Sequence, residues 1–504
     1  MRKFGLIFFL FFVVNLAFSQ YNYDFNKNCN EAYTAIINLK FSEGSQLIEQ
    51  EKRNNPNNNI PYLLDNYIYF LTVFIGEEEA EFDKLEKLKD DVIDRLKDGD
   101  ESSPYYRYSL AQVYLQWAFT RTKFKEYVSA TFEINKAYRL LEKNNKEFPE
   151  FLPNLINLGL LHTLIGTVPD NYNWIKKLVG IEGTIDQGVS EILTVLDAAI
   201  TQEEYSHFKA ECLFYMSFIQ MNLSTNKEKA LEYIDLIGND SSSFHNPLAI
   251  YAISRIYMSN GLNDKAIDLL LSRPTGAEYF PFDYLDYLTG LAKLYRLDKD
   301  ANQYFIKYVT NFKGMNYIKD SYQKIAWYYL VKNDIGKYKE YIAKVNQYGN
   351  DIIDADKQAE REAENGEIPN IHLLKSRILF DGGYYEKALA AMTGNTSSGF
   401  LQNEKDSLEF TYRIGRIYHE WGKPDNSIPF YDKTIQNGSE SEFYYAANSA
   451  LKLGNIYEDK GEYNKAISYY KEAQSMKNEE YKNSISQKAK AGIHRIENME
   501  LSLE

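Results

Sequence analysis

Two consecutive stretches carry one pattern, LEFTYRIGRIYHEWGKPDNSIPFYDKTI at residues 408–435 and ANSALKLGNIYEDKGEYNKAISYYKEAQ at residues 447–474. Five positions of the first stretch recur 39 residues later in the second, four with the same residue and one with another small residue. The pairs are Gly415/Gly454, Tyr418/Tyr457, Gly422/Gly461, Ser427/Ala466 and Tyr431/Tyr470. Similarity at one fixed offset is the signature of a repeat array. The two stretches therefore predict stacked copies of one structural unit.

The residue types of this pattern suit two packed helices. Gly415 and Ser427 are small, so they predict the place where the two helices cross. Tyr431 is large and is expected to fill the space beside that crossing, as alternation of small and large side chains gives dense packing. Gly422 lies between the helices, where a positive φ often ends the first one.

The order Leu/Ile-Gly-x-x-Tyr, then Gly, then Ala/Ser, then Tyr resembles the tetratricopeptide repeat (TPR) family. The family unit has 34 residues, and the five extra residues here fall between repeats, at Asn437–Phe443. Thr411 and Ala450 replace the aromatic residue expected early in the first helix. The resemblance implies an all-α fold, an α-solenoid of TPR-like helical hairpins wound as a right-handed superhelix.

Weaker copies of the pattern extend towards the N-terminus. The small position of successive first helices is assigned to Ser254, Ala292, Ala326, Ser376, Gly415, Gly454 and Gly492. Strand-like alternation nowhere exceeds a few residues, so an all-helical chain is predicted. Tyr481–Met499 is polar and is expected to cap the array as a lone helix.

The predicted organisation has five parts. A signal peptide covers 1–19, and 20–200 form a divergent helical-repeat region with an insertion at 166–183. In the insertion, Trp174 and Leu178 either belong to a short helix that plugs the groove or caps the N-terminal half, which we favour, or form a lid or partner-docking element. Degenerate repeats follow at 201–349, a charged linker or helical extension at 350–370, and TPR repeats with a capping helix at 371–504. Within the first helical hairpin, Ser42–Gly44 is predicted as the turn.

The N-terminus predicts export. Arg2 and Lys3 precede the apolar run Phe4–Leu16, and small residues before Gln20 suit cleavage between Ser19 and Gln20. The run is short for a membrane span of about 20 residues. We therefore expect a periplasmic or extracellular protein with no integral span after signal cleavage.

The composition limits the partners. A net charge of −14 becomes −16 without Arg2 and Lys3, which disfavours nucleic-acid binding. The 43 tyrosines suit a solenoid with a large residue at each helix crossing. Cys29 and Cys212 either form one disulfide or stay free, and the apolar run after Cys212 favours the unpaired state.

The sequence contains no recognisable catalytic pattern. The six histidines lie more than five residues apart, no cysteine pair has metal-ligand spacing, and neither a phosphate loop nor a serine nucleophile elbow is present. No catalytic, cofactor-binding or metal-binding residue is predicted, and the protein is not expected to be an enzyme.

The resemblance implies that the first helices line a groove for a protein or peptide partner. Transferring the exposed family positions gives Tyr251, Arg255, Arg377, Tyr412, Arg416, His419, Asn455 and Asp459. Arg255, Arg377 and Arg416 each follow the small residue of their repeat, and aligned arginines can hold carboxylates through paired hydrogen bonds. Alternatively, each arginine pairs with an acid of the neighbouring repeat and only supports stacking.

Three functions remain open from the sequence. The first is an exported, non-catalytic scaffold that binds a protein or peptide in its groove. The second is glycan binding, because some exported sugar-capture proteins use similar aromatic-rich helical scaffolds. The third is an all-α hydrolase with a carboxylate pair in the groove.

Overall fold

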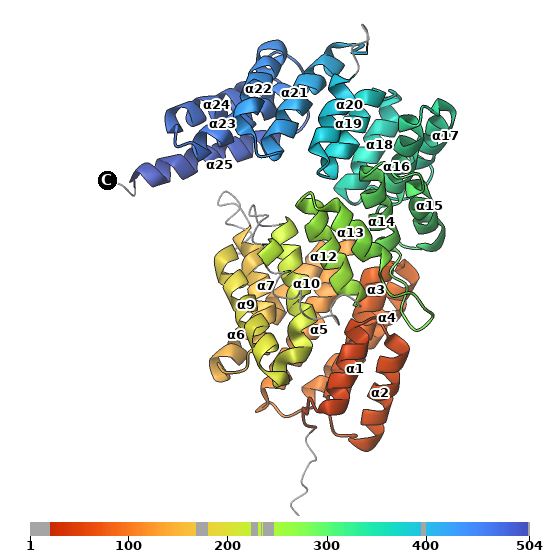
Figure 1. Ribbon diagram of the computed structural model, residues 1–504. Helices are drawn as coiled ribbons and strands as arrows, with labels where there is room; N and C mark the ends of the chain where they lie inside the picture. Colours follow the sequence, from red (N-terminus) through yellow and green to blue (C-terminus); the bar gives the residue numbers. More distant parts are fainter. Residues whose placement is uncertain are drawn as a thin grey trace, which may run out of the picture. The chain divides into compact units, whose positions relative to one another are not determined.

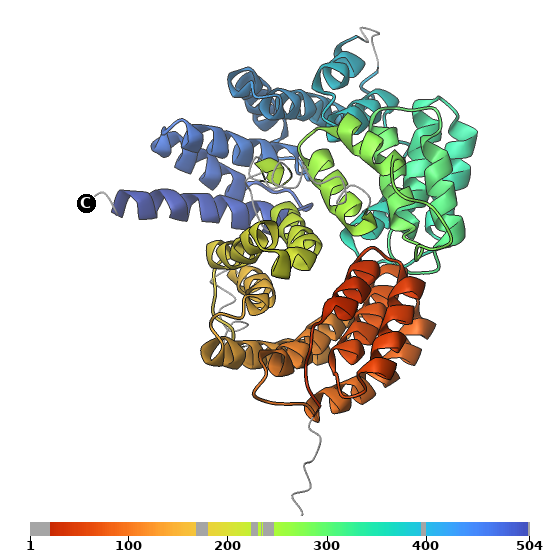
Figure 2. The ribbon, with the colours of Figure 1, turned by 60° about the horizontal axis from the view of Figure 1, so that its bottom comes forward.

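The structure, a computed structural model, describes residues 21–167, 180–222, 230–232, 234, 246–394 and 400–501. Helices dominate these residues, and their β-structure is limited to the isolated bridges Tyr21–Gly99 and Asn22–Asn58. Consecutive helices pack against each other in pairs (Figures 1 and 2). The predicted all-α solenoid of helical hairpins is confirmed, and the handedness of its superhelix stays a prediction.

The chain divides into two compact units. The first unit is Met1–Ile219 together with Thr275–Phe280, and the second is Gln220–Pro274 together with Pro281–Glu504. In the first unit the helices are α1 (Lys27–Ile37), α2 (Phe41–Asn54), α3 (Ile60–Gly76), α4 (Glu79–Lys97), α5 (Pro104–Lys123), α6 (Tyr127–Glu147), α7 (Pro153–Gly166), α9 (Ile185–Thr201), the 3-10 helix η2 (Glu203–Phe208) and most of α10 (Lys209–Asn222).

The second unit contains the two sequence repeats that define the array. Its helices are α12 (Pro247–Ser259), α13 (Asn263–Leu271), α14 (Tyr284–Tyr295), α15 (Ala301–Asn311), α16 (Ile318–Val331), α17 (Ile335–Val345), α18 (Asp354–Asn365), α19 (Ile371–Asp381), α20 (Tyr385–Thr393), α21 (Glu404–Glu420), α22 (Pro424–Gly438), α23 (Tyr445–Asp459), α24 (Tyr463–Ser475) and α25 (Lys482–Leu501).

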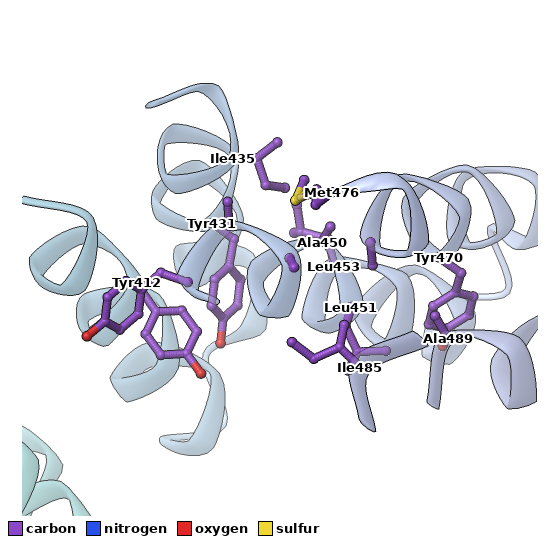
Figure 3. Packing of buried hydrophobic residues seen from close by; sticks show 14 of the residues in the cluster. Tyr412, Tyr431, Ile435, Ala450, Leu451, Leu453, Tyr470, Met476, Ile485 and Ala489 are labelled. Carbon is purple, nitrogen blue, oxygen red and sulfur yellow. The ribbon is translucent and has the colours of Figure 1, made fainter. Parts of the chain in front are cut away.

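Small and large residues meet at the helix crossings, as the sequence predicts. A Cβ atom on Gly415 would lie 2.8 Å from the ring of Tyr431, and one on Gly454 would lie 2.4 Å from the ring of Tyr470. Both tyrosines are fully buried in the core of the last repeats, where Tyr470 lies beside Ala489 of α25 (Figure 3). Any larger residue at these glycines would force the paired helices apart.

Eight hairpin turns among the described residues contain one residue in the left-handed region of backbone space. These turn residues are Leu39, Lys125, Gly261, Leu297, Asn333, Gly383, Gly422 and Gly461. The predicted role of Gly422 and Gly461 is confirmed, since φ is +72° at both. In four hairpins the same position holds leucine, lysine or asparagine, which tolerate that conformation less well than glycine.

A fixed spacing surrounds these turns. A small buried residue lies seven positions before each of these eight turn residues, and in six of the hairpins another small residue lies five positions after it. Around Leu39, Lys125, Gly261 and Gly383 these pairs of small residues are, in order, Ala32/Gly44, Ala118/Ala130, Ser254/Ala266 and Ser376/Ala388. The hairpin geometry of the C-terminal repeats therefore extends into the first unit, at α1/α2 and α5/α6.

Two sequence assignments are corrected by this spacing. The predicted turn at Ser42–Gly44 lies inside α2, where a Cβ on Gly44 would lie 2.7 Å from the side chain of Ile36, so this glycine marks a crossing. In the α14/α15 hairpin, Gly290 and not Ala292 lies seven residues before the turn residue. A Cβ on Gly290 would lie 3.0 Å from the Phe305 ring of α15.

The other sequence predictions stand as follows. The 350–370 stretch contains α18, which packs against α16 and α17. The 166–183 insertion falls between α7 and α9, which cross where Gly159 meets Gly188. Trp174, Leu178 and the signal peptide at 1–19 lie outside the described residues, and the five-part organisation stays a prediction.

The cysteines agree with the sequence analysis. Cys29 and Cys212 are both buried and free, as favoured above. Burial, with Glu51 nearby, raises the pKa of the Cys29 thiol to about 12. Within the described residues, no helix has both the length and the apolar character that a membrane crossing requires.

Candidate partner-binding surface

The second unit presents one equivalent side chain per repeat on its first helices. These residues, called here the first-helix row, directly follow the small crossing residue: Arg255, Leu291, Trp327, Arg377, Arg416 and Asn455. They come from α12, α14, α16, α19, α21 and α23 in turn. The register that the turns define therefore keeps all three predicted arginines in equivalent positions.

Arg416 stacks on aromatic rings and does not form an ion pair with a described residue. Its guanidinium carbon lies 4.5 Å from the centre of the Phe380 ring and 5.8 Å from that of Tyr412. Among the described residues, neither its buried Nε nor the buried Oγ of Ser376 finds a hydrogen-bond partner. Ser376, Phe380 and Arg416 line a narrow hollow together with Arg413 and Ile417, and this hollow is too small to admit a water molecule.

The neighbouring Arg413 is neutralised within the protein. It forms an ion pair with Glu409 one turn earlier on α21, and the Tyr445 hydroxyl donates a further hydrogen bond of 3.0 Å to that carboxylate. Burial favours the protonated form of Glu409, but the charge of Arg413 outweighs it and lowers the carboxyl pKa. The hollow therefore lies between one paired arginine and one stacked arginine.

Arg377 is held by the preceding repeat. Its guanidinium carbon lies 4.7 Å from the centre of the Trp327 ring. The Trp327 indole N–H in turn donates a hydrogen bond of 2.7 Å to Glu362 on α18. Burial raises the pKa of Glu362, while Trp327 and Arg377 act in the opposite direction. Stacking on aromatic faces thus replaces the acid pairing that the alternative interpretation expected.

Arg255 lies in a nest of tyrosines at the start of the second unit. Tyr251, Tyr284 and Tyr317 surround its side chain, and the Tyr284 and Tyr317 ring centres are 4.8 Å apart. The buried Nε of Arg255 has no hydrogen-bond partner among the described residues. Tyr251 is half-buried against Tyr284, at 5.7 Å between ring centres. This part of the row is therefore filled with rings.

The remaining predicted site residues are mostly engaged in packing. Tyr412 is only 1% exposed, and its hydroxyl accepts a 2.6 Å hydrogen bond from Asn448. Burial, followed by the charge of Lys452, lowers the pKa of His419 to about 4, so His419 is neutral at pH 7. Asn455 accepts a 2.8 Å hydrogen bond from Tyr470.

Asp459 alone of the predicted set is fully exposed. The adjacent Glu458 is bound by Arg495 of α25 through two hydrogen bonds of 2.9 and 2.8 Å. The capping helix thus covers the row beside the last repeat. The predicted set divides into Arg377 and Arg416 near a hollow, Arg255 and Tyr251 in a tyrosine nest, and residues that mainly pack.

Sequence reasoning missed several residues of this surface. Ser376 was assigned only as a crossing residue, and Arg413 lies one turn before Arg416. Trp327 follows the small residue Ala326 and was detectable from the same register. Glu362 carried no signal, because its contact with Trp327 depends on how α18 folds back.

Comparison with known proteins supports the repeat assignment. Residues 408–436 and 447–480 match the model of the tetratricopeptide repeat. No curated protein matches the chain. Among solved structures, the crystal structure of yeast Tom70 aligns at 13% identity over 90% of this chain and 95% of that chain, with a TM-score of 0.22. A TM-score this low supports no argument about fold or function. The chain therefore contains TPR repeats at its C-terminal end, within an all-α solenoid.

Proposed function

We propose that the protein is an exported, non-catalytic scaffold whose second unit binds an acidic segment of a partner protein through Arg416 and Arg377. TPR repeats and helical solenoids are typical of protein-binding scaffolds. The observation that carries the proposal is Arg416, a half-buried cation beside a hollow, whose Nε and whose neighbour Ser376 Oγ lack hydrogen-bond partners among the described residues.

The energetics favour a carboxylate ligand. A buried cation without an acceptor has lost hydration that stacking on Phe380 replaces only in part. A partner carboxylate at the mouth of this hollow would restore charge-assisted hydrogen bonds to the guanidinium. A hydrogen bond to a charged group contributes about 1.5–3 kcal/mol, which corresponds to roughly 10- to 100-fold in affinity.

The binding proposal is tested with peptides selected from a random displayed library on the full chain. The selected peptides should be rich in Asp and Glu, and Arg416→Ala should weaken their binding roughly 10- to 100-fold. Arg416→Lys should restore only part of the affinity, because lysine lacks the planar pair of donors. Lys488→Ala, which removes an exposed cation of α25, is the matched control and should change the affinity less than about 2-fold.

Two outcomes would refute the binding proposal. One is unchanged peptide affinity in Arg416→Ala alongside a lower melting temperature, which would make Arg416 a stacking residue only. The other is a selected set of peptides without acidic residues. Export is tested separately by N-terminal sequencing of the protein from cell fractions, where a start near Gln20 outside the inner membrane is expected and an intact Met1 in the cell interior contradicts it.

A further inference from the structure

Helix α18 interrupts the alternation of first and second helices in the second unit. It follows the α16/α17 hairpin, precedes α19, and lies beside α16 (Figure 1). Its sequence, DADKQAEREAEN, is strongly acidic and polar. Ala359 is its one fully buried apolar side chain. Polar contacts therefore hold α18 in place.

The first of these contacts is at the N-terminus of α16. The Asp356 carboxylate accepts hydrogen bonds from the backbone N–H groups of Tyr317, at 2.7 Å, and Asp320, at 2.9 Å. Tyr317 is the N-cap residue of α16 and has a positive φ, and its own side chain makes no capping bond. Asp356 therefore supplies the capping acceptor that the N-terminus of α16 otherwise lacks.

Two further acids contact the side of α16 that α18 covers. Glu360 forms an ion pair of 2.8 Å with Lys319. Glu362 accepts hydrogen bonds of 2.7 Å from both the Gln323 side-chain amide and the Trp327 indole. The three acids at 356, 360 and 362 thus meet a complementary line of donors along one helix, which is called here the α16 seat (the N-terminal N–H groups, Lys319, Gln323 and Trp327).

The α16 seat coincides with the first-helix row. Trp327 is the row residue of its repeat, equivalent to Arg377 and Arg416, and Gln323 stands four residues earlier, as Tyr412 does before Arg416. Helix α18 therefore covers, in α16, the position that Arg416 holds beside the hollow in α21. A segment of the chain already occupies this part of the row as a ligand would.

We propose that α18 occupies, within the chain, the seat of an acidic helical segment of a partner protein, and that such a segment binds the second unit by displacing α18. The inference rests on the proposed function, because it assigns the partner class and its regulation to the same row. The donors of the α16 seat and the spacing of the three acids on α18 indicate that the occupant is a helix with acids at the same spacing. The small apolar contact of α18 makes exchange feasible, since it leaves little hydrophobic surface to be exposed.

The test uses the separate peptide of residues 351–368, acetylated, amidated and fluorescently labelled. Its protein partner is the full chain carrying Asp356→Asn, Glu360→Gln and Glu362→Gln, which keeps the shape of α18 but removes its charges. This α18-neutral variant should bind the peptide at least about 10-fold more tightly than the wild type, because its own α18 competes less. A peptide with the same three neutral substitutions should bind neither protein.

The seat is identified by a second substitution. Trp327→Phe in the α18-neutral variant keeps an aromatic ring but removes the indole donor, and should weaken binding about 10-fold. Lys488→Ala in the same background should leave the affinity within about 2-fold, because it removes an exposed cation of α25 outside the α16 seat. Equal peptide binding by wild type and α18-neutral variant, or equal binding of charged and neutral peptides, overturns the proposal.

Hydrogen exchange of the wild-type protein gives an independent result if the variant fails to fold. Displacement requires the α18 amides to exchange faster than those of α16 and α17, through opening of α18 alone. Equal protection of the three helices would make α18 a permanent part of the fold and would overturn the inference. If Arg416→Ala abolishes binding of the selected acidic peptides while the α18 peptide fails to bind, the proposed function stands and only this inference falls.

Discussion

Replacement of Gly454 by alanine tests whether the helix crossings hold the array together. Tyr470 lies between two glycines: a Cβ on Gly454 of α23 would lie 2.4 Å from its ring, and a Cβ on Gly492 of α25 would lie 2.5 Å from it. Its hydroxyl lies within hydrogen-bond distance of two acceptors, Asn455 Oδ1 at 2.8 Å and the Glu458 carboxylate, which share its one proton. The ring is therefore fixed on both sides and at its tip.

The expected magnitude follows from this geometry. A new methyl group at Gly454 needs about 1 Å more room to reach ordinary van der Waals distance, and the ring cannot turn away. Overpacking of a dense core costs about 1–3 kcal/mol, and alanine recovers about 1 kcal/mol of helix propensity over glycine. Because both sides of the ring are blocked, we take the upper end and expect a net loss of about 2 kcal/mol.

The assay is native-state hydrogen exchange of amides in α23, α24 and α25, which reports the local free energy of opening in a long array. The matched control is Gly336→Ala on the exposed side of α17, where the nearest atom to a new Cβ is 3.6 Å away. The control should be neutral or stabilising by up to about 1 kcal/mol. In a Tyr470→Leu background, Gly454→Ala should lose its penalty. An unchanged or higher opening free energy for Gly454→Ala alone would refute the crossing model.

Three further predictions concern pH and the turns. Burial lowers the pKa of His207 to about 4. Between about pH 4 and 6.5 the unfolded state therefore binds one more proton than the folded state, so the melting temperature of the first unit should fall as the pH falls through this window. His207→Gln should flatten this pH dependence of the melting temperature. Burial raises the pKa of Asp356 to about 7, so between about pH 4 and 7 the folded state binds one more proton than the unfolded state. The protection of the α18 amides, corrected for intrinsic exchange, should therefore fall as the pH rises through this range. Asp356→Asn should remove this pH dependence. Lys125 has a φ of +64°, a conformation that glycine adopts without strain. Lys125→Gly should therefore raise the free energy of opening of the α5/α6 hairpin by about 0.5–1 kcal/mol, and Lys125→Val should lower it. Native-state hydrogen exchange of the α5 and α6 amides measures both effects.

The fold was predictable wherever glycine marks the turns and crossings. Gly415 and Gly454 defined the register of the last two hairpins, and the structure places both at crossings. Ala292 was wrongly assigned as the small crossing residue, two positions away from Gly290, because the turn residue of that hairpin is Leu297, and a leucine gives no turn signal in a sequence. Similarly, Gly44 resembled a turn residue, whereas the chain reverses at Leu39.

The surface was only partly predictable, for a different reason. The register alone places Arg377 and Arg416 in equivalent positions, because it depends on spacing along one helix. Whether an arginine meets an acid or an aromatic ring depends on contacts between repeats, such as that of Arg416 with Phe380. The α16 seat depends on α18 folding back over α16, and spacing along the chain carries no information about that contact.

The turns and the surface together show which constraints persist when the repeat sequence diverges. A positive φ between the helices recurs from Leu39 to Gly461, although the residue there is often not glycine. Non-glycine residues in this conformation cost roughly 1–2 kcal/mol each, so the packing that the turn permits must outweigh that cost in every hairpin. Within this chain, the turn geometry and the small residue at the crossing therefore recur from repeat to repeat, while the residue of the first-helix row is free to differ. That freedom allows equivalent positions to hold an arginine beside a hollow in α21 and a tryptophan beneath an acidic helix in α16.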